Sequence, residues 1–141
     1  MRDLIFRGQR CDNGEWVYGF YVRADHHWHN HGVHKDWIIC GASANGGWFA
    51  LHNKHAVKAD TVGQYTGLTD KNGTRVFEGD IVDILSECEE LGVIAYEDGA
   101  FVVNANGFSL DFISNIDGKD VEVIGNVWDN PELIGERKGN D

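Results

Sequence analysis

The stretch that decides the fold runs from residue 61 to residue 82 and reads TVGQYTGLTDKNGTRVFEGDIV. Its composition predicts a strand over residues 62–66 and a return strand over residues 74–77. Between them, residues 70–73 read DKNG, which is typical of a hairpin turn because Asp, Asn and Gly tolerate the required backbone geometry. A second tight turn follows, and residues 81–85 predict a third strand. The stretch therefore indicates short strands joined by tight turns.

Most of the remaining chain shows the same pattern of short apolar segments separated by turn residues. Further strands are predicted at residues 4–7, 16–22, 37–40, 48–51, 93–96, 100–104, 108–113 and 121–128. Residues 41–47 are predicted to be a flexible turn, because they are rich in glycine. Residues 130–133 predict a capped helical turn with proline at its first position. Residues 86–92 fit either one turn of helix or an acidic loop.

This spacing of strands and turns predicts an all-β fold with an N-terminal β unit and a C-terminal small SH3-like β-barrel. We expect residues 1–60 to form the N-terminal β subdomain, a candidate oligomerisation unit, and residues 61–134 to form the barrel. Closure into a barrel would hide strand edges and so limit edge-to-edge aggregation. Residues 135–141 are predicted to be a polar tail.

The charge of the chain is unevenly distributed along its 141 residues. The net charge is −11, and residues 1–70 hold seven Lys and Arg against seven Asp and Glu, whereas residues 71–141 hold five against sixteen. An acidic half repels a phosphate backbone, so the sequence argues against nucleic-acid binding by the predicted barrel. Such binding would need a local basic patch, drawn from Arg2, Arg7, Arg10, Arg23, Lys54 and Lys58.

Two further features bear on the cellular setting. No apolar run is long enough to span a bilayer and the start has no signal-peptide pattern, so we expect a soluble protein in the cytoplasm, with no membrane partner. Cys11, Cys40 and Cys88 lie far apart and form no CxxC pair, which excludes a disulfide framework and a zinc ribbon by spacing. We expect them to be buried or half-buried thiols in a reducing compartment.

Four blocks of the sequence carry a family resemblance. They are IFR (5–7) with WVYG (16–19), VGQYTGL (62–68) with DKNG (70–73), FEGDIV (77–82), and EVIGNVW (122–128) with NPEL (130–133). Together they resemble the YopX-like family of bacteriophage and prophage proteins, and residues 24–55 match no block. The resemblance implies a phage or prophage origin, an intracellular setting and self-association. It implies no catalytic residues.

The histidines are confined to one part of the chain. All seven lie between residues 26 and 55, and five of them fall in the run HHWHNHGVH at residues 26–34. On a strand, alternate imidazoles of this run would share a face, where they could bind zinc or nickel. The alternatives are a solvated polar hairpin, because the spacing matches no metal motif, and a pH-sensitive contact, because clustered imidazoles titrate near neutrality. The candidate metal ligands are His27, His29, His31 and His34, and His52 and His55 could join them only through the fold.

Catalytic patterns are missing from the sequence. It has no GxSxG, no HExxH and no phosphate-binding loop, and we expect Glu78 and Asp80 to serve turn geometry rather than catalysis. We therefore predict no catalytic and no cofactor-binding residues. The leading hypothesis is a non-enzymatic, oligomeric protein-interaction module of unassigned activity, whose partners are its own copies and a host or phage protein. The alternative is a metal-binding protein or metal-dependent enzyme that uses the run at residues 26–34.

Overall fold

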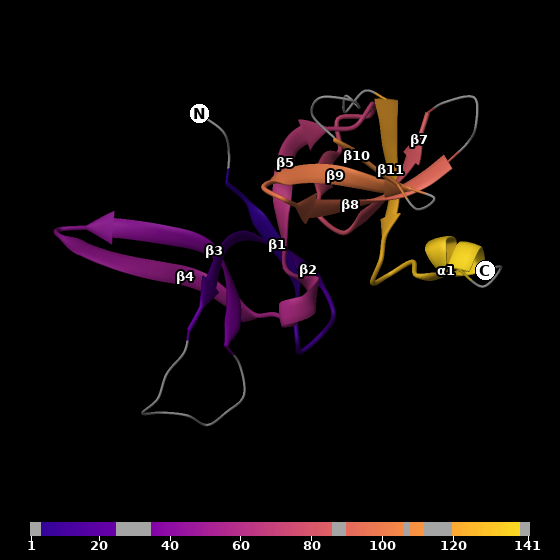
Figure 1. The fold of residues 1–141 in the computed structure, drawn as a ribbon. Helices are drawn as coiled ribbons and strands as arrows, with labels where there is room; N and C mark the ends of the chain where they lie inside the picture. The colour runs from indigo at the N-terminus through magenta and orange to yellow at the C-terminus, as the bar shows by residue number, and fades with distance from the viewer. Residues whose placement is uncertain (1–3, 25–34, 86–89, 106–107, 112–119, 139–141) are drawn as a thin grey trace. The chain divides into compact units, whose positions relative to one another are not determined.

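The computed structural model describes residues 4–24, 35–85, 90–105, 108–111 and 120–138, which divide into two compact units (Figure 1). The first unit is Met1–Gln64 and the second is Tyr65–Asp141. Antiparallel strands dominate both units, so the predicted all-β class is confirmed. No helix among the described residues is long and apolar enough to cross a membrane.

The first unit is an antiparallel sheet in the strand order β4-β3-β2-β1-β5. Its strands are β1 (Phe6–Gln9), β2 (Trp16–Arg23), β3 (Asp36–Asn45), β4 (Trp48–Ala56) and the start of β5 (Gly63–Thr69), with a short 3-10 helix η1 (Ala59–Thr61) before β5. Ile38 and Ile39 on β3 are buried, together with Val57. Gly19 on β2 allows the close approach of β2 to β3, because a Cβ atom there would collide with the carbonyl oxygen of Ile39.

Strands β3 and β4 form a longer hairpin than the sequence predicted. Gly46 and Gly47 form its tip with positive φ angles of 58° and 85°, as a two-residue turn between right-twisted strands requires. Cross-strand pairing extends from Trp37 opposite Ala56 to Asn45 opposite Trp48. The predicted strands at residues 37–40 and 48–51 were therefore too short, and the predicted flexible turn at 41–47 was wrong. Pairing with β4 overrides the weak strand propensity of the Gly-Ala-Ser segment.

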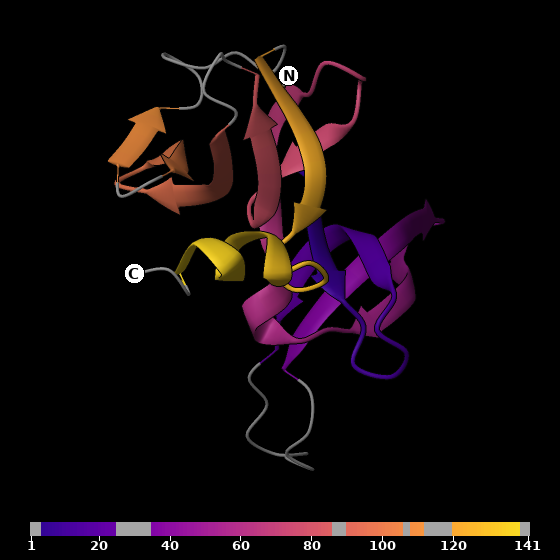
Figure 2. The ribbon, with the colours of Figure 1, turned by 90° about the vertical axis from the view of Figure 1, so that its right-hand side faces the viewer.

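The second unit contains the rest of β5, the short strand β6 (Arg75–Phe77) and a five-stranded antiparallel sheet in the order β10-β9-β8-β7-β11. Its strands are β7 (Asp80–Ile84), β8 (Glu90–Glu97), β9 (Ala100–Ala105), β10 (Phe108–Asp111) and β11 (Val121–Asn126). Figure 2 shows β11 beside β7, and helix α1 (Glu132–Lys138) follows β11 along the chain. As described, this sheet has β10 and β11 at its edges, so the SH3-like barrel stays a prediction.

The core of the second unit joins strands from the middle and the end of the chain. Its buried members are Val76, Val82, Ile94, Phe101, Val103 and Val121. Buried and less buried residues alternate along β9, whereas consecutive residues are buried on β6 and β7. Helix α1 begins at Glu132 and continues to Lys138, so it extends into the segment predicted to be a polar tail.

The carboxylate of Asp70 connects the predicted hairpin turn to strand β11. Its Oδ1 accepts hydrogen bonds from the backbone N–H groups of Asn72 (2.8 Å) and Thr74 (2.9 Å), and its Oδ2 accepts one from Val123 (2.9 Å). Gly73 takes a φ of 83°, so the turn predicted at residues 70–73 is confirmed. Burial raises the pKa of Asp70, but the backbone donors of Val123, Thr74 and Asn72 outweigh burial and lower the pKa below its ordinary value.

The second turn brings two distant sequence blocks together. Gly79 has a φ of 91°, and a Cβ atom there would collide with the ring of Trp128. The Gly79 carbonyl also accepts a hydrogen bond from Val127 N–H at 3.0 Å. Asp80 is 2% exposed and its Oδ2 accepts a hydrogen bond from Phe77 N–H at 2.7 Å, which bridges the turn. The prediction of turn chemistry for Asp80 is therefore confirmed.

Replacing Asp70 by asparagine should lower the free energy of unfolding of the second unit by about 2–4 kcal/mol. An amide has one acceptor oxygen, so a backbone N–H loses its partner, and hydrogen bonds to a charged group are worth about 1.5–3 kcal/mol. Amide hydrogen exchange on β7 and β11 measures the loss. Asp83→Asn is the control, because Asp83 lies half-buried on β7 and its carboxylate, unlike that of Asp70, accepts no backbone hydrogen bond among the described residues. Equal protection in the two variants would contradict the role of Asp70.

The stabilisation from Asp70 should also depend on pH. Because its folded pKa lies below the unfolded value, the contribution is present above the unfolded pKa and is lost as the pH falls through the folded pKa. Exchange rates measured between about pH 5 and pH 2 should show a steeper loss of protection in the wild type than in Asp70→Asn. Parallel curves for the two proteins would exclude this linkage.

Gly79→Ala should destabilise the second unit more than Gly99→Ala. Both glycines have positive φ angles, 91° and 82°, but a Cβ atom at Gly99 would meet no atom within 4 Å. The strain common to both sites is about 1 kcal/mol, and the collision with Trp128 should add roughly 1–3 kcal/mol at Gly79. Urea titrations of the two variants measure the difference. Matching midpoints would show that the Trp128 ring moves aside without cost.

Candidate interaction surface and a neighbouring pocket

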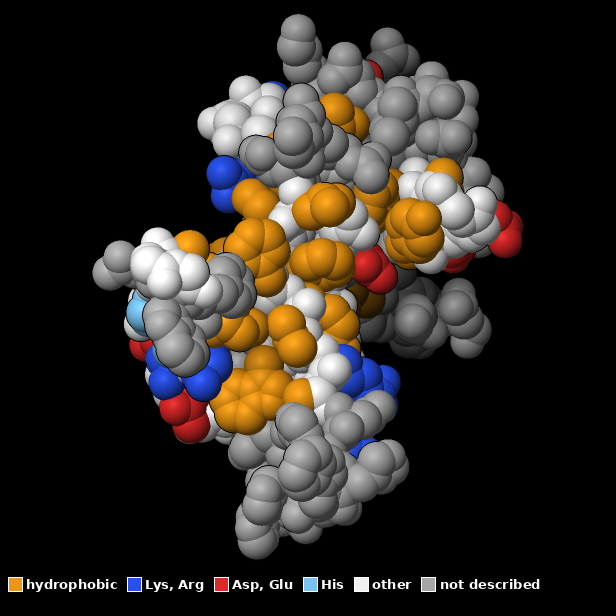
Figure 3. Space-filling model, turned by 90° about the vertical axis from the view of Figure 1, so that its left-hand side faces the viewer, with side chains coloured by type: hydrophobic (Ala, Val, Ile, Leu, Met, Phe, Trp, Pro, Cys, Tyr) orange, Lys and Arg blue, Asp and Glu red, His pale blue; other side chains and the backbone are white. Residues whose placement is uncertain are grey.

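Strand β2 exposes a stripe of apolar side chains. Tyr18, Phe20 and Val22 alternate along the strand, so they share one face, and they are 48%, 60% and 40% exposed. Phe20 pairs with Ile39 and Val22 pairs with Trp37 on β3, which places further apolar side chains on the same face. Figure 3 draws a face on which hydrophobic side chains are exposed at the surface. Gathered apolar side chains indicate a contact surface, whereas single exposed ones do not.

The outer part of the β3–β4 hairpin, residues 41–53, is named the arm. In Figure 1 it extends away from the other strands of its unit. Its side chains of described burial are mostly exposed on both faces of the ribbon, including Leu51 at 41%. The arm contains no Asp, Glu, Lys or Arg, although 25% of the whole chain is charged. His52 Nε2 lies 2.6 Å from Ser43 Oγ across the two strands.

Strand β4 also presents a free edge. It ends the strand order of its sheet, and among the described residues its arm portion pairs with β3 alone. A strand at the end of a sheet carries N–H and C=O groups that can pair with another chain, and proteins commonly protect such edges with charges or proline. The arm has neither of these. Its edge is therefore available for strand pairing.

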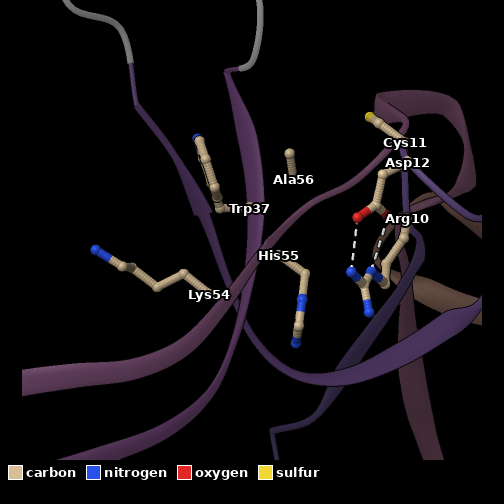
Figure 4. Close-up of a pocket in the computed structure, with 7 residues that line it drawn as sticks. All are labelled: Arg10, Cys11, Asp12, Trp37, Lys54, His55 and Ala56. Atoms are coloured by element: carbon tan, nitrogen blue, oxygen red, sulfur yellow. Dashed lines mark hydrogen bonds and ion pairs between the residues drawn. The ribbon is translucent and has the colours of Figure 1, made fainter.

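A pocket of about 350 Å³ lies at the base of the arm (Figure 4). Its lining residues are Arg10, Cys11, Asp12, Trp37, Lys54, His55 and Ala56. Cys11 N–H donates a hydrogen bond to the Ala56 carbonyl (2.9 Å), which holds the turn after β1 against the end of β4. The turn then departs from β4, and the pocket lies where this pairing ends.

Arg10 and Asp12 form a two-point ion pair at the rim of the pocket. Arg10 Nε lies 2.9 Å from Asp12 Oδ1, and Arg10 Nη2 lies 2.7 Å from Asp12 Oδ2. The hydrogen bond from Arg10 lowers the pKa of the Asp12 carboxyl below its ordinary value. Asp12 therefore stays ionised near neutral pH, and its charge is balanced by Arg10.

The residues predicted as metal ligands fall outside the described part of the chain. His27, His29, His31 and His34 all lie there, so the metal site stays a prediction. In the described ranges, no group of three or more His, Cys, Asp and Glu residues could hold a metal ion. His52 contributes to the arm, whereas His55 lines the pocket.

Two expectations about single residues changed. Cys11 and Cys40 are exposed thiols, so the expectation of burial was wrong for both, and Cys88 lies outside the described residues.

The sequence analysis also missed the pocket, because its lining comes from three separate segments. The sequence does contain a signal for the arm, which is the uncharged run at residues 41–53. The glycines in this run led instead to the prediction of a flexible turn.

Comparisons with known proteins place these features in context. A family model described as YopX protein matches residues 5–135. The crystal structure of protein EF1440 from Enterococcus faecalis is similar to this chain, with a TM-score of 0.61 and 22% sequence identity. The similarity covers 95% of this chain and 99% of that one, and at this identity it shows a shared fold alone. No curated protein sequence matches the chain.

Proposed function

We propose that this chain, which belongs to the YopX family, is a non-enzymatic phage or prophage protein that assembles with copies of itself through the arm. The observation that carries the proposal is the exposure of the uncharged arm on both faces. An isolated two-stranded hairpin is marginally stable in water. Docking on another chain would supply the burial and the edge pairing that this ribbon lacks within its own unit.

The distribution of charge favours a second copy as the partner of the arm. Residues 65–141 hold five Lys and Arg against seventeen Asp and Glu, a net charge of −12, so second units repel each other. Residues 1–64 hold seven against six, and the arm contributes none of them. Two copies therefore meet with the least electrostatic cost through their first units.

Antiparallel pairing of β4 with β4 of a second copy fits this chemistry. Such a pair has two-fold symmetry, in which residue i of one strand meets residue j of the other and residue j meets residue i. The arm contributes no Asp, Glu, Lys or Arg that could face a like charge across the pair. The stripe of Tyr18, Phe20 and Val22 supplies a second apolar surface in the same unit.

The proposal also covers the partner and the fold of the second unit. Its net charge of −12 suits a host or phage protein with a basic surface in the host cytoplasm, and it disfavours nucleic acid. Its five-stranded antiparallel sheet is compatible with the small SH3-like barrel expected for residues 61–134. We include the barrel in the proposal on that basis.

Leu51→Lys should weaken self-association by at least about tenfold, because it places a lysine on the edge strand of each copy, where a charge opposes strand pairing. Sedimentation velocity over a range of protein concentrations measures the association, and far-UV circular dichroism checks the fold. The matched control is Tyr96→Lys, which adds the same charge at a 52% exposed aromatic site in the second unit.

Two results would reject the assembly proposal. A wild-type protein that sediments as a monomer throughout the micromolar range would exclude self-association. A Leu51→Lys variant that associates as strongly as the wild type would show that copies meet elsewhere.

A further inference from the structure

We propose that the pocket at the base of the arm binds a small organic anion that carries a flat aromatic ring. The pocket is distinct from the arm edge and does not depend on assembly. Its volume of about 350 Å³ falls at the lower end of the range of small-molecule sites, about 300–1,000 Å³. Its lining includes the indole of Trp37, the small side chain of Ala56 and two basic side chains, of which Lys54 extends away from Arg10 in Figure 4.

The strand register explains the space in the pocket. Trp37 on β3 lies directly opposite Ala56 on β4, so the two side chains share one face of the hairpin. Ala56 is small, and it leaves open the volume that a larger residue opposite the indole would fill. A flat ring can therefore stack on Trp37 above Ala56, as aromatic rings do at separations of about 4.5–7 Å.

Lys54 supplies the charge for the anion. It pairs in register with Ile39, two residues from the Trp37–Ala56 pair, so Lys54 lies on the same face and diagonal to Trp37. Such diagonal neighbours are about 7–8 Å apart at their Cα atoms, within reach of long side chains. A carboxylate or phosphate attached to a ring on Trp37 could therefore reach the ammonium group.

The charge balance of the lining favours an anion. Arg10 contacts Asp12 through two atoms and also lies 4.0 Å from Glu15, which does not line the pocket, whereas Lys54 makes no ion pair within the part of the chain that the structure describes. His55 also lines the pocket, but it pairs with Ile38 and so lies on the opposite face of β4 from Lys54 and Ala56. The lining itself thus holds two basic side chains against one carboxylate, in a protein of net charge −11.

These features define a class of ligand. A nucleoside monophosphate and an aromatic carboxylate share the required chemistry, which is one anionic group on a planar ring. A long polyanion fits less well, because the lining holds one unbalanced cation and the net charge of −11 repels the remaining phosphates.

The test is a two-dimensional NMR titration of the full-length protein with four probes: adenosine 5′-monophosphate, benzoate, adenosine and inorganic phosphate. We expect the two ring-bearing anions to shift the Trp37 indole N–H and the amides of residues 54–56 in a saturable way. Adenosine lacks the anionic group and inorganic phosphate lacks the ring, so each should bind at least about tenfold more weakly.

Matched variants separate a built site from general attraction of anions. Lys54→Met should weaken binding of the ring-bearing anions at least tenfold, and Trp37→Leu should do the same by removing the stacking surface. Lys58→Met is the control, because Lys58 belongs to the same unit and does not line the pocket. Leu51→Lys should bind the anions normally, so failure of the assembly proposal and failure of this one give different results.

Three outcomes would overturn the inference. The first is the absence of saturable shifts from either ring-bearing anion up to about 10 mM. The second is equal weakening by Lys58→Met and Lys54→Met, which would mean non-specific attraction. The third is phosphate binding as tightly as adenosine 5′-monophosphate, which would mean an adventitious ion only.

Discussion

The three backbone hydrogen bonds accepted by the Asp70 carboxylate are the interaction on which the second unit depends. Two of them shape the turn after β5, and the third holds Val123 on β11, so one side chain joins segments about fifty residues apart. A buried carboxylate is stable there because each oxygen is matched by N–H donors that the fold holds in place. The same donors lower its pKa, which makes the junction stable at neutral pH and sensitive to acid.

This junction gives the family resemblance a structural meaning. The blocks at residues 70–73, 77–82 and 122–128 are separate in sequence and meet in the second unit, through Asp70 with Val123 and through Gly79 with Trp128. Their characteristic residues form turns and close approaches between backbones. The contacts of these blocks therefore account for the fold of the second unit.

The first unit follows a different principle. Its core holds Ile38, Ile39 and Val57, while the arm and the β2 stripe leave apolar groups and a strand edge exposed. The arm, and the β3 and β4 residues of the pocket, lie largely within residues 24–55, where no block of the resemblance occurs. The arm thus lies outside the blocks of the resemblance, whereas the β2 stripe includes Tyr18 of the WVYG block at residues 16–19.

The sequence by itself determined the all-β class, the turn at residues 70–73 and the role of Asp80, because these follow from local backbone preferences and side-chain alternation. Only the tertiary structure decided how far β3 and β4 extend, since strand pairing overrides the weak propensity of residues 41–45. It also decided that Asp70 reaches Val123 and that Trp37 and Lys54 border one pocket with the turn after β1. Those groups come together through cross-strand partners that are remote in sequence, and no local preference encodes which strands will pair.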